Sequence, residues 1–188
     1  MLGIDDESFF RGKIPMTKQE IRILTLAKAN LEKNSIIVDI GAGTGSITIE
    51  AAKLATNGKI FAIERKFEAI ELIKRNVEKF SVKNVEIICA EAPDGLKNLP
   101  KLDAAIIGGS GGKLEEILDI ISSKLKIGGR IVINAITIQT LAASMAYFRA
   151  NDWKYDAFQV QITHFEKIGS YDMAKALNPV WIITAEKF

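Results

Sequence analysis

Short apolar runs recur along the chain at intervals that leave room for one helix between successive runs. The runs are nearly continuous rather than alternating, which is typical of parallel strands whose two faces are both buried. They predict strands over residues 35–40, 59–64, 85–89, 102–107 and 129–134.

The segments between these runs carry apolar residues at helical spacing. Thr17, followed by Glu20 three residues later, has the pattern of a capping box and predicts a helix that continues to Leu31. Gly128-Gly129 is predicted to stop a later helix and to be followed by the fifth strand. The apolar stripe of the first helix is Ile21, Leu24, Leu26 and Leu31, and further helices are predicted over about residues 46–56, 67–80, 113–124 and 138–150.

The last part of the chain changes character. Residues 156–165 alternate between polar and apolar positions, and residues 179–185 form a second apolar run with no strong helix between them. This pattern predicts a C-terminal antiparallel hairpin at the edge of a mostly parallel sheet. The whole chain, residues 1–188, is therefore expected to form one doubly wound, Rossmann-like α/β domain. In such sheets a ligand lies beyond the C-terminal ends of the central strands.

Composition narrows the class of protein. The 188 residues are 48% hydrophobic and 26% charged, the ordinary mix of a soluble globular domain, and the formal net charge of +2 does not favour bulk binding to nucleic acid or membranes. The single Cys89 excludes a disulfide framework, and the single His164 leaves neither a His-ligated metal site nor a conventional Ser–His–Asp triad. The acidic start does not have the pattern of a signal peptide, and no apolar run reaches the roughly 18 residues of a membrane span. We therefore expect a cytoplasmic protein.

A glycine-rich loop follows the first predicted strand. The run Asp39-Ile40-Gly41-Ala42-Gly43-Thr44-Gly45-Ser46 ends that strand and leads into a helix, whose N-terminus offers free N–H groups to a ligand. The third glycine comes one residue too early for a dinucleotide fingerprint, and the Gly-Lys-Ser/Thr of a phosphate-binding loop is missing. The pattern instead resembles motif I of the class I S-adenosylmethionine (AdoMet) methyltransferases.

Three further strand ends and loops also agree with the resemblance to class I AdoMet methyltransferases. Glu64 ends the second strand, where its carboxylate can accept hydrogen bonds from both hydroxyls of a ribose, although NAD enzymes use an acid at a similar place. Residues 90–94 follow the third strand, where class I methyltransferases commonly hold adenine. The fourth strand is followed by Gly108-Gly109-Ser110-Gly111-Gly112, whose exposed backbone N–H groups suit a large planar acceptor.

Four segments together resemble the CbiT family, the decarboxylating cobalt-precorrin-6B C-15 methyltransferases of cobalamin biosynthesis. They are residues 11–22, the glycine loop, the 108–112 loop and Asn178-Pro179-Val180, so that the resemblance covers essentially the whole chain. It implies a homotetramer that transfers a methyl group from AdoMet to C-15 of a corrinoid and promotes loss of CO2 from its C-12 acetate. The AdoMet-binding residues that it implies are Thr17, Gly41, Ala42, Gly43, Thr44, Gly45, Glu64 and Ala92.

No residue is assigned as a general base, because an electron-rich macrocycle carbon can accept the methyl group directly once the two reactants are aligned. Basic residues near the site are candidates for binding the carboxylates of the corrinoid, and the hairpin region is a candidate lid. Two alternatives stay open: a class I methyltransferase that acts on tRNA or protein, and an NAD-dependent oxidoreductase. His164 is expected to be a strand residue; the basic candidates are Arg11, Lys13, Lys18, Arg22 and Lys113, and the lid candidates are Tyr171, Met173 and Lys175.

Overall fold

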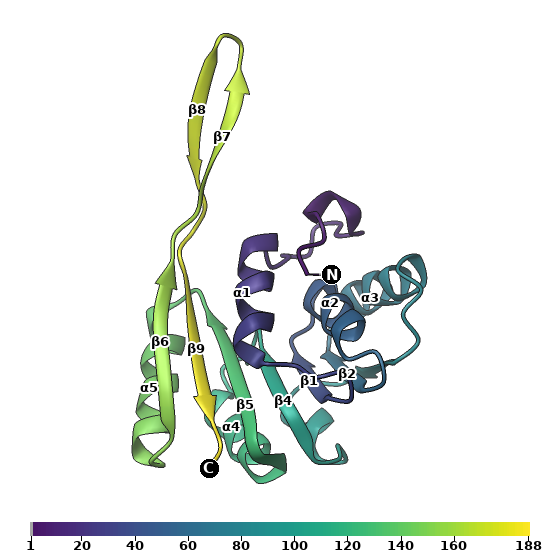
Figure 1. The fold of residues 1–188 in the computed structure, drawn as a ribbon, viewed down its shortest axis with the longest axis vertical. Coiled ribbons are helices and arrows are strands. Elements are labelled where there is room, and N and C mark those ends of the chain that lie inside the picture. Colours follow the sequence, from purple (N-terminus) through teal and green to yellow (C-terminus); the bar gives the residue numbers. More distant parts are fainter. Residues whose placement is uncertain (1) are drawn as a thin grey trace.

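A seven-stranded sheet forms the centre of the computed structural model, which describes residues 2–188 (Figure 1). The strand order is β3-β2-β1-β4-β5-β9-β6. The order reverses between β1 and β4, which places a crevice at the C-terminal ends of these two strands. The five parallel strands are β1 (Ile36–Ile40), β2 (Lys59–Glu64), β3 (Val85–Cys89), β4 (Leu102–Ile107) and β5 (Leu125–Ala135), and the antiparallel strands are β6 (Lys154–Val160) and β9 (Val180–Glu186).

Helices cover both faces of the sheet. Apolar residues of α1, α2 and α3 bury one face, while those of α4 and α5 bury the other together with the alternate residues of the same strands. The doubly wound α/β prediction is thereby confirmed. The helices are α1 (Gln19–Ala29), α2 (Ser46–Leu54), α3 (Phe67–Lys79), α4 (Leu114–Lys124) and α5 (Ile138–Ala150), with short 3-10 turns at η1 (Asp6–Ser8) and η2 (Asp94–Leu96). No helix within residues 2–188 is long and apolar enough to cross a membrane.

Three predicted boundaries were wrong. The N-cap of α1 is Lys18 rather than Thr17, because the Thr17 carbonyl accepts a hydrogen bond from Arg22 Nη1 at 2.6 Å and Thr17 stays outside the helix. The helix ends at Ala29 because Asn30 adopts the left-handed conformation, with φ 51° and ψ 52°. Gly128-Gly129 does not stop α4 but lies inside β5, where the pairing with β4 shifts register and forms a bulge.

The C-terminal hairpin is longer than predicted. Its outer parts, β6 and β9, join the sheet in antiparallel fashion as expected, and β9 lies between β5 and β6. The run predicted as one strand over residues 156–165 is divided, however, because β6 ends at Val160 and a new strand, β7 (Thr163–Ile168), begins beyond it. This strand pairs with β8 (Tyr171–Ala176) in a separate ribbon that projects away from the domain (Figure 1).

Candidate active site

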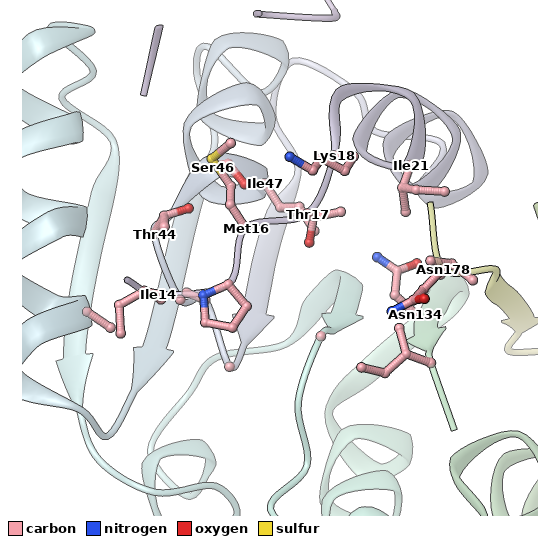
Figure 2. Close-up of a pocket in the computed structure, with 18 of the residues that line it drawn as sticks. Ile14, Met16, Thr17, Lys18, Ile21, Thr44, Ser46, Ile47, Asn134 and Asn178 are labelled. Atoms are coloured by element: carbon pink, nitrogen blue, oxygen red, sulfur yellow. The ribbon is translucent and has the colours of Figure 1, made fainter. Parts of the chain in front are cut away.

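A pocket of about 340 Å³ lies at the C-terminal ends of the sheet strands. The glycine loop after β1 and the segment Ile14–Lys18 form one side of it (Figure 2). The end of β5 and the base of the β7–β8 ribbon contribute the other side. This is the crevice that the reversal of strand order predicts.

The glycine loop comes into close contact with two other segments. Gly41 has a φ of 72°, and a Cβ atom there would lie 2.9 Å from the backbone nitrogen of Gly109. Gly43 has a φ of 58°, and a Cβ atom there would lie 3.4 Å from the carbonyl oxygen of Pro15. Gly41 therefore favours glycine both for its left-handed backbone and for the close approach of Gly109, whereas Gly43 favours it for the left-handed backbone alone, because a Cβ atom 3.4 Å from its neighbour would be in ordinary contact.

The last two residues of the loop have different surroundings. Gly45, with a φ of 76°, lies behind the loop, where a Cβ atom would come within 3.2 Å of the Ile73 side chain on α3. Thr44 is fully buried and lines the pocket, yet its hydroxyl oxygen has no hydrogen-bond partner within residues 2–188. An unpaired buried hydroxyl is costly, so its placement here suits a ligand that supplies the missing partner.

Glu64 is held in place by the backbone. Its Oε2 accepts a hydrogen bond from the Gly43 N–H at 3.0 Å, and its Oε1 accepts from the N–H groups of Arg65 and Lys66 at 2.8 and 2.9 Å. An ionised carboxylate can accept about four hydrogen bonds, so this one retains capacity for a ligand hydroxyl. The side chain is 8% exposed and lies between the main pocket and a smaller hollow that Ala92 lines.

Asp39 lies beneath the glycine loop and is 1% exposed. Burial raises the pKa of this carboxyl to about 6, although the hydrogen bond that Thr48 Oγ1 donates to Oδ2 at 2.5 Å opposes the shift; the negative charge of Glu64 raises the pKa further. Asp39 therefore links the end of β1 to α2, the two elements that flank the glycine loop, through a carboxyl whose pKa lies near 6.

The residues predicted to bind AdoMet gather at these two cavities. Thr17, Gly41–Thr44 and Glu64 line the main pocket, Ala92 lines the adjoining hollow, and Gly45 lies behind the loop. Because the two cavities share Gly41 and Glu64, one elongated ligand can extend through both. The cradle without Cβ atoms, the unpaired Thr44 hydroxyl and the preset Glu64 carboxylate fit the amino acid and the sugar of AdoMet.

Most basic candidates have acidic partners. Arg22 was one of the candidates for binding the corrinoid carboxylates, but it is fully buried, its Nε pairs with Glu50 at 2.8 Å, and its Nη1 pairs with Asp6 at 2.6 Å. Its role is to fix the N-terminal segment that leads to the pocket. Lys18 lines the pocket and also contacts Asp6, at 3.3 Å. Lys113 pairs with Glu91 beside the smaller hollow, while Arg11 and Lys13 are exposed.

The candidate lid residues occupy the ribbon. Tyr171, Met173 and Lys175 are exposed on β8, whereas the pocket is lined by Ile162 and Leu177 at the base of the ribbon. His164 lies on β7, as predicted, with its Nε2 atom 3.2 Å from a carboxylate oxygen of Glu20.

The sequence interpretation missed Asn134 and Lys66, which also line the pocket. Asn134 could have been found from the sequence, because it is a polar residue directly after the apolar run 131–133 of β5. Lys66 follows Glu64 among several other charged residues, so no pattern distinguished it.

Comparison with known proteins identifies the family. The sequence model of the precorrin methyltransferase domain matches residues 8–187. The chain belongs to the precorrin methyltransferase family. A probable cobalt-precorrin-6B C(15)-methyltransferase (decarboxylating) of Sulfurisphaera tokodaii is 45% identical over 188 residues, which cover 98% of this chain and 97% of that protein.

Two solved structures of precorrin enzymes have the same fold. The precorrin-6y C5,15-methyltransferase of Geobacter metallireducens is 42% identical, with a TM-score of 0.94 over 99% of this chain and 98% of that one. The precorrin 8w decarboxylase of Methanobacterium thermoautotrophicum is 34% identical, with a TM-score of 0.92 over 97% of this chain and 98% of that one. The Rossmann-like methyltransferase fold expected from the sequence is therefore confirmed.

Proposed function

We propose that the chain, acting as one domain, methylates C-15 of a corrinoid precursor with AdoMet and removes the carboxyl group of the C-12 acetate as CO2. The substrate would be cobalt-precorrin-6B and the product cobalt-precorrin-7, within cobalamin biosynthesis. One observation carries this proposal. The chain belongs to the precorrin methyltransferase family, and its pocket has the glycine loop on one side and a mainly apolar wall on the other.

The glycine-loop side would bind AdoMet, which supplies an activated methyl group when bound. Glu64 would accept hydrogen bonds from the ribose hydroxyls, and the backbone of residues 41–45 would approach the amino acid portion. The Thr44 hydroxyl and Thr17 would complete this side of the main pocket. Ala92 would contact the base in the smaller hollow.

The opposite side would hold the corrinoid. Ile21, Ile162, Leu177 and Val180 line it, and Ile136 extends to the rim with 72% of its surface exposed. Such a wall offers apolar contact to a large conjugated ring and excludes water from the reacting atoms. Lys18 and Lys66, which also line the pocket, would pair with carboxylates on the ring periphery.

The decisive experiment is mass spectrometry of cobalt-precorrin-6B after incubation with the protein and methyl-labelled AdoMet. We expect a product that gains one labelled methyl group and loses CO2. Gain of the methyl group without loss of CO2 would contradict the second half of the proposal. Transfer of the label to tRNA or to protein, with the corrinoid unchanged, would replace the proposal with the alternative methyltransferase reading.

We further propose that the protein is a homotetramer, as the family resemblance implies, and acts in the cytoplasm, where the free and exposed Cys89 would stay reduced. An isolated two-stranded ribbon is marginally stable in water, which supports a role for subunit contacts at β7 and β8. Phe165 and Tyr171 on this ribbon are 75% and 74% exposed. Light scattering should give a tetramer for the natural chain and smaller species for Phe165→Glu combined with Tyr171→Glu.

A further inference from the structure

One buried amide joins the glycine loop to the N-terminal segment. Asn76 lies on α3 and is fully buried. Its Oδ1 accepts a hydrogen bond from the Phe10 N–H at 2.9 Å, and its Nδ2 donates to the carbonyl oxygens of Phe10 and Thr44, both at 2.9 Å. Only this orientation of the amide satisfies all three groups, because the two carbonyls can accept but not donate. A single side chain therefore ties α3, the glycine loop and the N-terminal segment together.

Residues 11–17 form a strap that runs from this amide to the start of α1. At the far end of the strap, the Thr17 carbonyl accepts a hydrogen bond from Nη1 of the buried Arg22 at 2.6 Å. Within residues 2–188, the strap has one further hydrogen bond, an internal one from the Ile14 N–H to the Arg11 carbonyl at 3.1 Å. The position of the strap thus depends on the anchors at its two ends.

The strap forms part of the glycine-loop side of the main pocket. Its carbonyl at Pro15 is in contact range of the loop, 3.4 Å from the place that a Cβ atom would take at Gly43. A ligand between two segments binds tightly when both are already in place, because otherwise part of its binding free energy goes into bringing them together. The strap residues that line the pocket are Ile14, Pro15, Met16 and Thr17 (Figure 2).

Other contacts hold the N-terminal segment on α3 without the amide. Phe9 is buried and packs against Phe80, with the ring centroids 4.9 Å apart. The Phe10 ring lies 4.0 Å from the guanidinium carbon of Arg75. The segment therefore stays attached when the Asn76 amide is removed. What the amide adds is the alignment of the segment's backbone with the glycine loop.

We propose that Asn76 is a positioning residue for AdoMet: its amide aligns the strap with the glycine loop, so that the ligand binds between them. The proposal rests on the proposed function, in which the glycine-loop side holds AdoMet. Asn76 itself is not among the residues that line the two cavities, so it acts through Thr44 and the strap rather than by contact with the ligand. Its removal should therefore lower the affinity for AdoMet and spare the later chemical step.

Asn76→Ala tests this role. We expect calorimetric titration to show roughly 10- to 100-fold weaker AdoMet binding, because loss of the amide lowers the fraction of molecules in which strap and loop are aligned. In the labelled-AdoMet assay, KM for AdoMet should rise by a similar factor. The value of kcat and the KM for cobalt-precorrin-6B should stay within about threefold, a split that general damage to the fold would not produce.

Asn84→Ala is the matched control. The Nδ2 of Asn84 also donates to two backbone carbonyls, those of Ala52 and Ala55, at 3.1 and 2.7 Å. These carbonyls lie at the C-terminal end of α2, whereas the pocket is lined by residues at its N-terminal end. This variant should lose stability in urea denaturation, yet its AdoMet affinity should stay within about twofold of the natural chain.

Three results would overturn the proposal: no weakening of AdoMet binding in folded Asn76 variants, equal weakening in Asn76→Ala and Asn84→Ala, or a fall in kcat with an unchanged KM for AdoMet. Asn76→Ser, which keeps one hydroxyl donor, should weaken AdoMet binding less than Asn76→Ala, and it replaces that variant if the alanine protein does not fold. If the natural chain itself does not bind AdoMet, the proposed function fails, and the role of Asn76 fails with it.

Discussion

The two sides of the pocket are built in different ways. The glycine-loop side comes mainly from one continuous stretch, residues 39–46, joined by Glu64 at the end of the neighbouring strand and by the segment Ile14–Lys18, and it relies largely on backbone conformation. The opposite side combines side chains from α1, β5 and the base of the ribbon, which lie far apart in the sequence. A site made of backbone leaves a local pattern in the sequence, whereas a site made of distant side chains does not.

The strongest test of this contrast is Gly41→Ala. We expect a loss of about 2–4 kcal/mol in the free energy of unfolding, because left-handed backbone strain adds to a clash with the Gly109 backbone. AdoMet binding should weaken more than tenfold, since the loop can no longer keep its shape. Urea denaturation and titration calorimetry measure the two effects.

Gly128→Ala is the matched control for that variant. Gly128 has a similar φ of 76°, but a Cβ atom there would have no neighbour within 4 Å, so only the strain of about 1–2 kcal/mol applies. AdoMet affinity should not change. Equal effects of the two substitutions would show that the contact between the loops after β1 and β4 is unimportant.

Glu64→Ala tests the side chain whose carboxylate is assigned to the ribose on the glycine-loop side. We expect AdoMet binding to weaken by about 1–3 kcal/mol, the range for removing a charged hydrogen-bond partner. Calorimetric titration with AdoMet provides the measurement. The control is Glu86→Ala, which removes an exposed carboxylate from β3 that pairs with Lys59 at 3.1 Å and should leave AdoMet affinity unchanged. Unchanged affinity in Glu64→Ala would rule out the ribose assignment.

Asp39→Asn tests the support beneath the loop through the pH dependence of stability. The pKa of Asp39 is raised from 3.8 to about 6 in the folded protein, so its favourable contribution to stability is full below pH 4 and is lost as the pH rises through 6. The asparagine variant carries no charge, so it should be more stable than the natural chain by about 1–2 kcal/mol at pH 7.5, with most of this gain absent at pH 4. Urea denaturation at both values measures it, and an equal gain at both would contradict the assigned cause.

The smallest loss of ligand affinity is expected from Asn178→Leu, on the side of the pocket opposite the glycine loop. Asn178 lines the pocket but is exposed, so water competes for its hydrogen bonds. We expect corrinoid binding to weaken by about 0.5–1 kcal/mol and AdoMet affinity to stay within twofold. Absorbance titration measures the corrinoid affinity. A loss of AdoMet affinity larger than that of Glu64→Ala would show that the two sides do not bind separate ligands.

Much of the fold followed from local patterns. The five parallel strands were predictable because burial on both faces demands continuous apolar runs, and the helices between them because one apolar stripe must face the sheet. Two of the errors occurred where a side-chain contact that no local pattern reveals overrides a local preference. Thr17 had the pattern of a helix cap, but its carbonyl accepts a hydrogen bond from Arg22 and it stays outside the helix. Arg22 had the pattern of a surface cation, but it is buried and forms ion pairs with Glu50 and Asp6.

The sequence alone determined the glycine loop, because a left-handed backbone and the close approach of another chain segment admit few residues other than glycine. It also determined the carboxylate of Glu64 at the end of the second strand and the resemblance to the precorrin methyltransferase family. The tertiary structure decided that Gly45 lies behind the loop, that β7 and β8 leave the sheet, and that Asn134 faces the pocket. These features depend on which side chains from remote segments come together, and a pattern confined to one segment carries no information about its distant neighbours.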